Sequence, residues 1–310
     1  MKEDVSFKTG GRFFPIIGIL ALVLFQSLEI CAEPLASAAH RFVCVDNGAN
    51  RLLLVDQQSP SNGWSAAIPS GSRDLQRLDG GKLLVSHGNG CGVYDLKDGR
   101  ALWRLDGFTG VQTARFIPER DELMLGAIAK NAAEFHFLKR DGDWFQKTGR
   151  VVRVTGMEPG LLRLVRFTSD GHALFTTGSP YRVIEWDLAV NKEVWSAPLP
   201  GKGYLAMRRA DGTTVASTGG TVSVVEISRD GKIAKTWLGD AYRKEYRLDW
   251  FSGFEFLPNG HLVIANWLGH GAQGKGPHVI EVDSENKLVW SWEDHVAAKQ
   301  ITHLLMLDDK

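Results

Sequence analysis

The fold of this chain is decided by the stretch Phe251-Ser-Gly-Phe-Glu-Phe-Leu-Pro-Asn-Gly-His-Leu-Val-Ile-Ala-Asn266 and by the two runs that follow it, Pro277-His-Val-Ile-Glu-Val282 and Lys287-Leu-Val-Trp-Ser-Trp292. β-Branched and aromatic residues dominate these runs, and Asn-Gly, a glycine-rich loop and Asp-Ser-Glu-Asn separate them. Because such separators are turn sequences, the pattern predicts four antiparallel strands joined as a meander. One sheet of this size cannot bury both of its faces alone, so further copies are expected.

The further copies share an ending: Gly or Asn, then Lys or Arg, two variable residues and Trp. This ending occurs at Gly99–Trp103, Asn191–Trp195 and Asn286–Trp290. A weaker copy, Gly231–Lys235, has Lys in place of Trp, and the most diverged copy ends in Asp141-Gly-Asp-Trp144. A period of roughly 40–50 residues with all-β character predicts propeller blades rather than a sandwich.

The two ends of the chain are predicted to share one blade. The strands expected at 40–46, 50–56 and 64–68 form a sheet without an innermost strand, whereas Ile301–Leu307 is a strand with no sheet of its own. Adding the last strand to the first sheet closes the ring and removes its open edges. The prediction is an all-β, six-bladed β-propeller of four-stranded antiparallel blades, in a single domain at 40–310. Its first strands are expected near Leu75, Thr113, Leu162, Tyr204, Phe254 and Leu304.

Residues 1–39 are predicted to be a secretory signal peptide. Basic residues precede an apolar run at 13–25, and small residues follow at 36–38. This order is typical of a signal peptide, and the run is short for a membrane span, which needs about 20 residues. An uncleaved N-terminal anchor is the alternative. Lipidation of Cys31 is disfavoured, because Glu29 and Ile30 stand where small residues are needed. The mature protein is therefore expected to be secreted or periplasmic, without a membrane span.

Composition narrows the classes of partner. Lys and Arg together number 36, as do Asp and Glu, so no charge excess points to nucleic acid or to an acidic membrane surface. No linker rich in Pro and Ser divides the chain. The expectation is a monomer whose partner is a small polar molecule, a glycan or a protein.

Two cysteines, Cys44 and Cys91, remain after removal of the signal peptide. They could pair in an oxidising compartment. Two buried, unpaired thiols are the favoured reading, because a disulfide needs Cα atoms within about 7 Å.

The blade ending, the run Leu257–Trp267 and the run Gly276–Val282 together resemble the PQQ-like β-propeller superfamily. More narrowly, they resemble secreted bacterial PQQ-binding-like β-propeller repeat proteins, over essentially all of 40–309. The resemblance implies the fold and leaves the function open. The quinoprotein dehydrogenases of this superfamily are larger, eight-bladed proteins that hold a quinone with calcium. This chain is too short for them and lacks a matching Asp/Glu/Asn calcium constellation, so no cofactor is expected.

The loop 266–278 is the first candidate for a site. It is long, rich in glycine and expected at one mouth of the central channel, where propeller ligands bind. Trp267 could provide a stacking face, and His270 and His278 could act as acid or base. Alternatively, Trp267 packs on a neighbouring blade and the histidines are satisfied. The spacing of the two histidines is too loose to predict a metal, and none is predicted.

Loops between blades are expected to reach the same face. They include Arg73, Lys202, the segment 242–250 and Asp294-His295. Convergence of these loops with 266–278 would place the ligand beside the sixth blade.

Four inner-strand residues, Gln76, Arg115, Arg166 and Glu255, fall in one column when the blades are aligned on their turns. A polar column on the innermost strands could line the channel and bind an anion. The alternative is that these side chains pair with one another or with water. His303, near the mouth end of the closing strand, is a weaker candidate.

Two functions of different classes follow. One is a binding or scaffold propeller; the other is a hydrolase, lyase or sulfotransferase that uses His and Arg at the same mouth. The chain contains no Gly-x-Ser-x-Gly elbow, P-loop or His-Glu-x-x-His motif, so binding is favoured and enzyme activity is left open. The predicted ligand-binding residues are Asn266, Trp267, His270, His278, Arg115, Arg166, Glu255, Asp294, His295 and His303.

Overall fold

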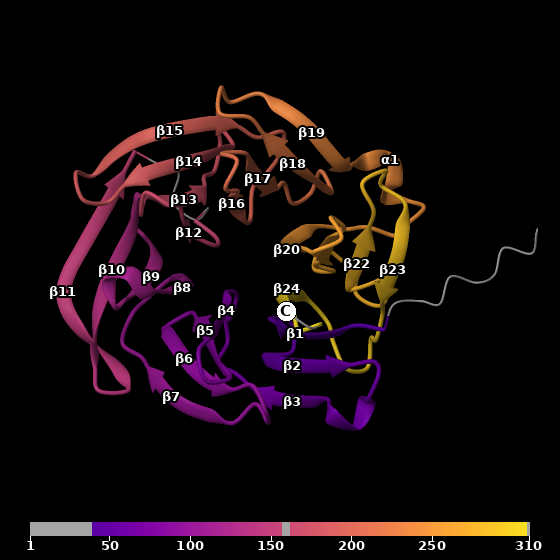
Figure 1. Ribbon diagram of the computed structural model, residues 1–310, viewed down its shortest axis with the longest axis horizontal. Helices are drawn as coiled ribbons and strands as arrows, with labels where there is room; N and C mark the ends of the chain where they lie inside the picture. The colour runs from indigo at the N-terminus through magenta and orange to yellow at the C-terminus, as the bar shows by residue number, and fades with distance from the viewer. Residues whose placement is uncertain (1–38, 157–161, 309–310) are drawn as a thin grey trace, which may run out of the picture. The chain divides into compact units, whose positions relative to one another are not determined.

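A computed structural model describes residues 39–156 and 162–308. These residues form six four-stranded antiparallel sheets placed around a central axis as the blades of a propeller (Figure 1). The predicted fold class is therefore confirmed. The predicted signal peptide, apart from Ala39, lies outside the described residues.

Each sheet runs from the channel to the rim in chain order, apart from the first, whose innermost strand is the last of the chain. The first blade is β24 (Ile301–Met306), β1 (Arg41–Asp46), β2 (Arg51–Asp56) and β3 (Trp64–Ala67). The second blade is β4 (Leu75–Leu78), β5 (Lys82–His87), β6 (Gly90–Asp95) and β7 (Ala101–Leu105). The third blade is β8 (Val111–Ile117), β9 (Glu122–Ala129), β10 (Ala132–Asp141) and β11 (Trp144–Thr155).

The remaining three blades follow the same plan. They are β12 (Arg166–Phe167), β13 (Ala173–Thr176), β14 (Arg182–Asp187), β15 (Lys192–Pro198); β16 (Ala206–Arg208), β17 (Thr214–Ser217), β18 (Ser223–Ile227), β19 (Ile233–Leu238); and β20 (Phe251–Phe256), β21 (Leu262–Asn266), β22 (Val279–Val282), β23 (Leu288–Trp292). Helical turns η1 (Pro60–Asn62), η2 (Pro118–Arg120) and α1 (Asp240–Arg243) connect strands.

The ring closes as predicted. β24 pairs antiparallel with β1, with Cys44 opposite Leu304 and Val43 opposite Leu305. The C-terminal strand therefore supplies the edge that β1 would otherwise expose to the channel, and the label β24 lies beside β1 near the centre of the ring (Figure 1).

Two inner strands begin later than expected. Leu162 and Tyr204 lie ahead of β12 and β16. Tyr204 still bonds within its own blade, because its N–H donates to the carbonyl of Ser217 at 3.1 Å. Leu164 N–H donates to the carbonyl of Tyr204 at 3.1 Å, so this segment of the fourth blade is tied to the fifth blade rather than to its own β13.

The core lies between neighbouring sheets, and the repeated tryptophans pack there. Trp103 stacks on Trp144 of the next blade with ring centroids 5.8 Å apart. The indole of Trp195 donates to the carbonyl of Arg229 at 2.9 Å. Trp290 is 5 % exposed, in the cluster that joins the sixth blade to the first. Each repeated Trp therefore fills the contact with the following blade.

Cys44 and Cys91 are both buried and free. Burial raises the pKa of each thiol above its ordinary value, which makes them unreactive core residues. The favoured reading of two unpaired thiols agrees with the structure.

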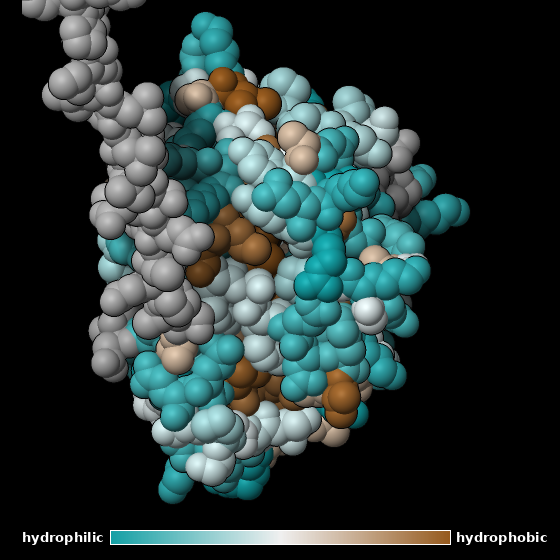
Figure 2. Space-filling view, turned by 90° about the vertical axis from the view of Figure 1, so that its right-hand side faces the viewer, coloured by the Kyte–Doolittle hydropathy of each residue, from teal (hydrophilic) through white to brown (hydrophobic). Residues whose placement is uncertain are grey.

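The side of the ring seen in Figure 2 is largely hydrophilic, with hydrophobic residues in small groups between polar ones. Over the described ranges 39–156 and 162–308, no helix has the length and apolar character needed to cross a membrane.

Candidate functional site

A small cavity lies at the end of the channel where the inner strands begin. Its volume is about 180 Å³. Residues that precede β4, β12, β16 and β20 line it together with residues that follow β21 and with the start of β24. The lining residues are Arg73, Arg163, Lys202, Tyr204, Trp250, Trp267, His270 and Thr302. We call this cavity the mouth pocket.

One wall of the mouth pocket is a chain of aromatic rings. Tyr204 meets Trp250 edge-to-face at 5.3 Å, Trp250 meets Trp267 at 5.9 Å, and Trp267 meets His270 at 5.0 Å. Edge-to-face contacts of this kind are favourable and directional, so each ring restrains the next.

Two glycines allow the indoles to take these positions. A Cβ at Gly269 would overlap the ring of Trp267. A Cβ at Gly219, whose φ is +57°, would lie 2.5 Å from Cε2 of Trp250. Gly269 and Gly219 therefore serve close packing of the aromatic wall.

Cationic side chains line the pocket as well. Burial lowers the pKa of Arg163 and of Lys202, and the charge of Arg163 lowers that of Lys202 further. Arg73 also lies close enough to Arg163 for its charge to lower the pKa of that guanidinium. Among the described residues that line the pocket, none carries a carboxylate. Three positive groups therefore converge on one small volume.

One buried donor in the pocket, the indole N–H of Trp267, lacks a hydrogen-bond partner within 39–156 and 162–308. Burial raises the pKa of Tyr204, although the charges of Arg73 and Arg163 and a side-chain hydrogen bond with Arg73 act in the opposite direction. The phenol therefore keeps its proton and is paired with Arg73. A buried donor without an acceptor is costly, and a ligand oxygen would satisfy the indole N–H.

Asn266 acts on the pocket indirectly. Its Oδ1 accepts from the backbone N–H of Asp249 at 2.9 Å and of Trp250 at 3.3 Å, and its Nδ2 donates to the carbonyl of Pro277 at 2.8 Å. Asn266 thereby ties both ends of loop 266–278 to the segment that carries Trp250.

His278, Asp294 and His295 lie together behind the loop. The rings of His278 and His295 are 4.7 Å apart, and Nδ1 of His278 accepts from the backbone N–H of Asp294 at 3.4 Å. Burial, then the nearby His295, lowers the pKa of His278 to about 4. His295 bonds with Glu293 at 2.9 Å. These residues join the loop to the link after β23, and none of them lines the mouth pocket.

Below the pocket, a buried carboxylate holds the channel arginines. Asp74 is fully buried and bonds with Nη2 of Arg166 at 3.1 Å and with the hydroxyl of Thr113. Arg166 also lies 2.7 Å from Nε2 of His303, and Arg115 lies 3.9 Å from Asp74. Burial opposes ionisation of Asp74, but Arg166 and Arg115 hold its pKa below the ordinary value. Burial and the charge of Arg166 lower the pKa of His303 to about 3, so this imidazole is neutral.

The predicted column of four residues exists in the register. Each of the four residues pairs with the third residue after the turn that follows its strand. The pairs are Gln76 with Leu84, Arg115 with Met124, Arg166 with Leu174, and Glu255 with Val263. The side chains of these four residues, however, have different kinds of partner.

Gln76 accepts from the backbone N–H of Phe116 at 2.8 Å, and Glu255 accepts from that of Met306 at 2.8 Å. These two side chains therefore hold the inner strand of the next blade. Arg115 and Arg166 instead reach Asp74 and line an opening at the other end of the inner strands. The structure thus brings Trp267 and His270 together in the mouth pocket and places the two arginines elsewhere.

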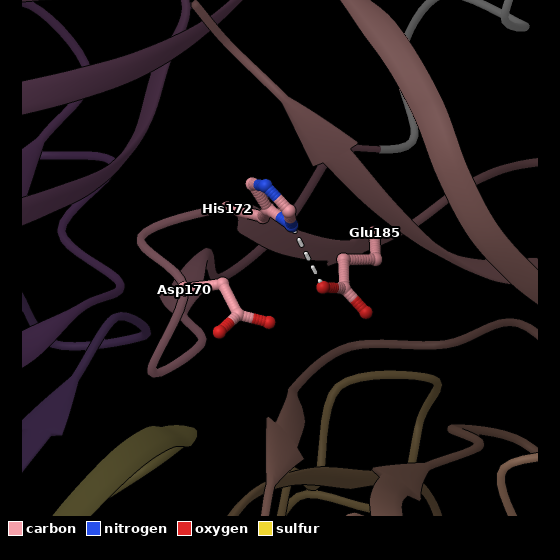
Figure 3. A group of neighbouring side chains, drawn as sticks. All are labelled: Asp170, His172 and Glu185. Carbon is pink, nitrogen blue, oxygen red and sulfur yellow. Dashed lines mark hydrogen bonds and ion pairs between the residues drawn. The ribbon is translucent and has the colours of Figure 1, made fainter.

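A cluster of metal-ligand type, Asp170, His172 and Glu185, lies on the fourth blade (Figure 3). Its ligand atoms are within 4.8 Å of one another. Glu185, however, already bonds with His172 at 3.0 Å and with Nη2 of Arg208 in the fifth blade at 2.6 Å. A guanidinium on the shared carboxylate repels a cation, which argues against a metal centre.

The same arrangement recurs in the sixth blade. His261 bonds with Glu281 of the same blade at 2.6 Å. The partner of Glu281 in the next blade is His40, at 2.7 Å, as Arg208 is the partner of Glu185. Asn259 stands where Asp170 stands in the fourth blade. Because the His–Glu pair repeats at equivalent positions of two blades, we interpret it as a structural contact that joins neighbouring blades.

No family model matches the chain, and no curated protein matches it. Among solved structures, a protein of unknown function from Bacteroides caccae superposes with a TM-score of 0.73 and 21% identity, over 88% of this chain and 100% of that one. A streptogramin B lyase superposes with a TM-score of 0.55 and 12% identity, over 89% of this chain and 95% of the lyase. The likeness is one of fold. It supports the propeller fold and assigns no catalytic residue of the lyase to this chain.

Proposed function

We propose that the protein is a binding propeller that holds a small anionic molecule in the mouth pocket. The observation that carries the proposal is the convergence of Arg73 and Lys202, beside Arg163, with the buried indole N–H of Trp267, which has no partner among the described residues. A carboxylate would accept from these donors and offset the positive charge with charge-assisted hydrogen bonds.

The aromatic wall narrows the ligand class. Trp250 and Trp267 offer ring surfaces next to the cations. The pocket, at about 180 Å³, is smaller than the roughly 300–1,000 Å³ of pockets for drug-sized ligands. A single ring that carries a carboxylate, such as a sugar acid, fits both features: the ring lies on an indole and the acid meets the cations.

An enzyme of the hydrolase, lyase or sulfotransferase type is the alternative, and no observation favours it. His270 is the imidazole among the described lining residues, and Thr302 provides an aliphatic hydroxyl. The hydroxyl of Thr302 donates to the carbonyls of Val45 and Arg73, both at 3.3 Å, and no hydrogen bond joins it to His270 among the described residues. The likeness to a streptogramin B lyase is one of fold, so it does not raise the case for lyase chemistry.

Two finer assignments belong to the same proposal. Membership of the PQQ-like superfamily rests on the Gly-Lys-x-x-Trp endings, and a secreted or periplasmic location rests on the signal pattern of residues 1–39. A monomer that uses one mouth for a small ligand, a glycan end or an acidic side chain of a protein is the expected state.

The test uses the full chain and a panel of small carboxylates led by D-glucuronate and benzoate, with D-glucose as the neutral control. Thermal shift and calorimetry should show binding of the acids and little binding of glucose. Lys202→Met removes one positive charge while keeping the aliphatic stem, so it should weaken the acids by about tenfold with an unchanged fold. The proposal fails if the acids stabilise no more than sodium chloride at equal ionic strength, or if Lys202→Met leaves their affinities unchanged.

A further inference from the structure

A second opening lies at the other end of the inner strands, where β8 and β12 finish. Its volume is about 650 Å³, and it is lined by Arg115, Arg166 and the turns 116–120 and 167–171. Among the residues that the structure describes, none lines both this opening and the mouth pocket. We call it the base pocket.

The two inner-strand arginines of the base pocket, Arg115 and Arg166, are held to different degrees. Arg166 donates to the carbonyl of Val165 at 2.7 Å, to Asp74 at 3.1 Å and toward His303 at 2.7 Å. Arg115 makes one such bond, to the carbonyl of Leu75 at 3.2 Å, and lies 3.9 Å from Asp74, beyond hydrogen-bond range. A guanidinium has five N–H donors, so most of those of Arg115 are unused among the described residues.

The charges around this pair do not balance. Asp74 is the carboxylate that faces both guanidiniums, and His303 is neutral beside them. Burial lowers the pKa of Arg115 to about 9, and the charge of Arg166 adds to this effect against the opposing charge of Asp74. Arg115 is therefore still cationic near neutral pH, and a second negative group beside it would be favourable.

The rim adds both signs of charge and neutral donors. Arg120 donates to the carbonyl of Gly171 at 3.1 Å and so ties the two turns together. Glu119 and Asp170 are exposed carboxylates on these turns, and Ser169 provides a hydroxyl. The exposed carboxylates are screened by water more strongly than Arg115, whose side chain is 18 % exposed, so Arg115 is the cation that an ion inside the pocket would meet.

We propose that the base pocket is a second site, for a small oxyanion that bonds to Arg115 beside the fixed guanidinium of Arg166. The shared chemistry is a phosphate or carboxylate group, which matches a guanidinium with two parallel hydrogen bonds. The site is independent of the mouth pocket and does not rest on the function proposed for it.

The test compares sodium phosphate, sodium succinate and sodium chloride at matched ionic strength, by thermal shift and calorimetry on the full chain. Phosphate, succinate or both should stabilise the protein relative to chloride, and the responding salt identifies the source of the oxyanion. Arg115→Met should weaken that binding by about tenfold or more. Arg100→Met, which removes an exposed guanidinium outside both pockets, is the matched control and should retain it.

Arg115→Lys guards against misfolding of the Met variant. It keeps the charge but loses the two-pronged geometry, so oxyanion binding should fall between those of the parent and the Met variant. The proposal is overturned if neither salt stabilises more than chloride does, or if an Arg115 variant that melts cooperatively responds as the parent does. Lys202→Met then separates the two pockets. Oxyanion binding that falls in Lys202→Met but not in Arg115→Met belongs to the mouth pocket and overturns the proposal for the base pocket, whereas the reverse result supports it.

Discussion

The imidazole of His40 lies 2.7 Å from the carboxylate of Glu281, so the residue that begins the first blade is bonded to the third strand of the sixth blade. The other ring nitrogen of His40 bonds with Asp308, directly after the closing strand. Glu281 also accepts from His261 of its own blade. One buried cluster thus joins the first blade, the last blade and the C-terminal segment.

The closing cluster should make stability depend on pH through His40. Burial opposes a charged His40, but hydrogen bonds to Glu281 and Asp308 outweigh burial and raise its pKa above 6.5. A raised pKa in the folded state means that the contribution is complete below the unfolded value and is lost as pH rises through the folded value. The pKa of Glu281 is lowered from 4.5, so its contribution is present above that value and is lost in stronger acid.

The measurement is the melting temperature at a series of pH values that begins below 6.5, the ordinary pKa of His, and continues upward through the raised pKa of His40. His40→Gln should lose most stability at the acid end of this range, and the gap between parent and variant should narrow as pH rises. His270→Gln, in the exposed mouth loop, serves as the control. A gap that is constant with pH, or that widens towards alkaline pH, would contradict the assignment.

Removing the closing strand should open the ring. Deletion of Thr302–Lys310 takes away the partner of β1 and leaves its backbone groups unpaired beside the channel. The expected result is loss of cooperative melting, or aggregation visible by size-exclusion chromatography. A truncated protein with the melting temperature of the parent would show that β24 does not close the ring.

The repeated tryptophans should differ in their contribution to stability according to burial. Trp290 is 5 % exposed, meets Phe42 at 6.0 Å and donates to Gln57 at 3.1 Å. Trp290→Ala should therefore cost about 3–5 kcal/mol, the usual range for a buried Trp. Trp195 is only half-buried, so Trp195→Ala should cost clearly less. Urea unfolding of both variants measures the loss in the free energy of unfolding. Equal losses for Trp290→Ala and Trp195→Ala would contradict the prediction that the more buried Trp contributes more.

The fold could be predicted because its evidence is local. The Trp endings, the Asn-Gly turns and the unpaired segment 301–307 each lie within a few neighbouring residues. The column that contains Arg115 could be predicted for the same reason, since turns set the register and the register sets the facing residues. Two interblade tryptophans, Trp64 and Trp237, escaped the pattern because they stand outside the aligned position.

The candidate site could be predicted only in part, because its residues come from different blades. Trp267 and His270 stood out in a long loop, whereas Tyr204, Arg163 and Thr302 looked like ordinary strand residues. A buried Asp74 that pulls two arginines of the column inward is a contact across blades, and no local pattern reports it. Gln76 and Glu255 share that column and bind backbone instead, which depends on the distance to the next blade.

Gly269 offers a way to disturb the aromatic wall without removing a polar group. Gly269→Ala would place a methyl group against the ring of Trp267 and force the indole away from Trp250. The expected result is weaker binding of D-glucuronate in calorimetry by about tenfold, because both the stacking surface and the indole donor move. The melting temperature should change little, since the loop is on the surface and Trp267 is only half-buried. Gln273→Ala, an exposed position in the same loop, is the matched control and should bind as the parent does. Unchanged binding in Gly269→Ala, together with intact folding, would show that the position of Trp267 does not matter for the ligand and would remove the aromatic wall from the proposed site.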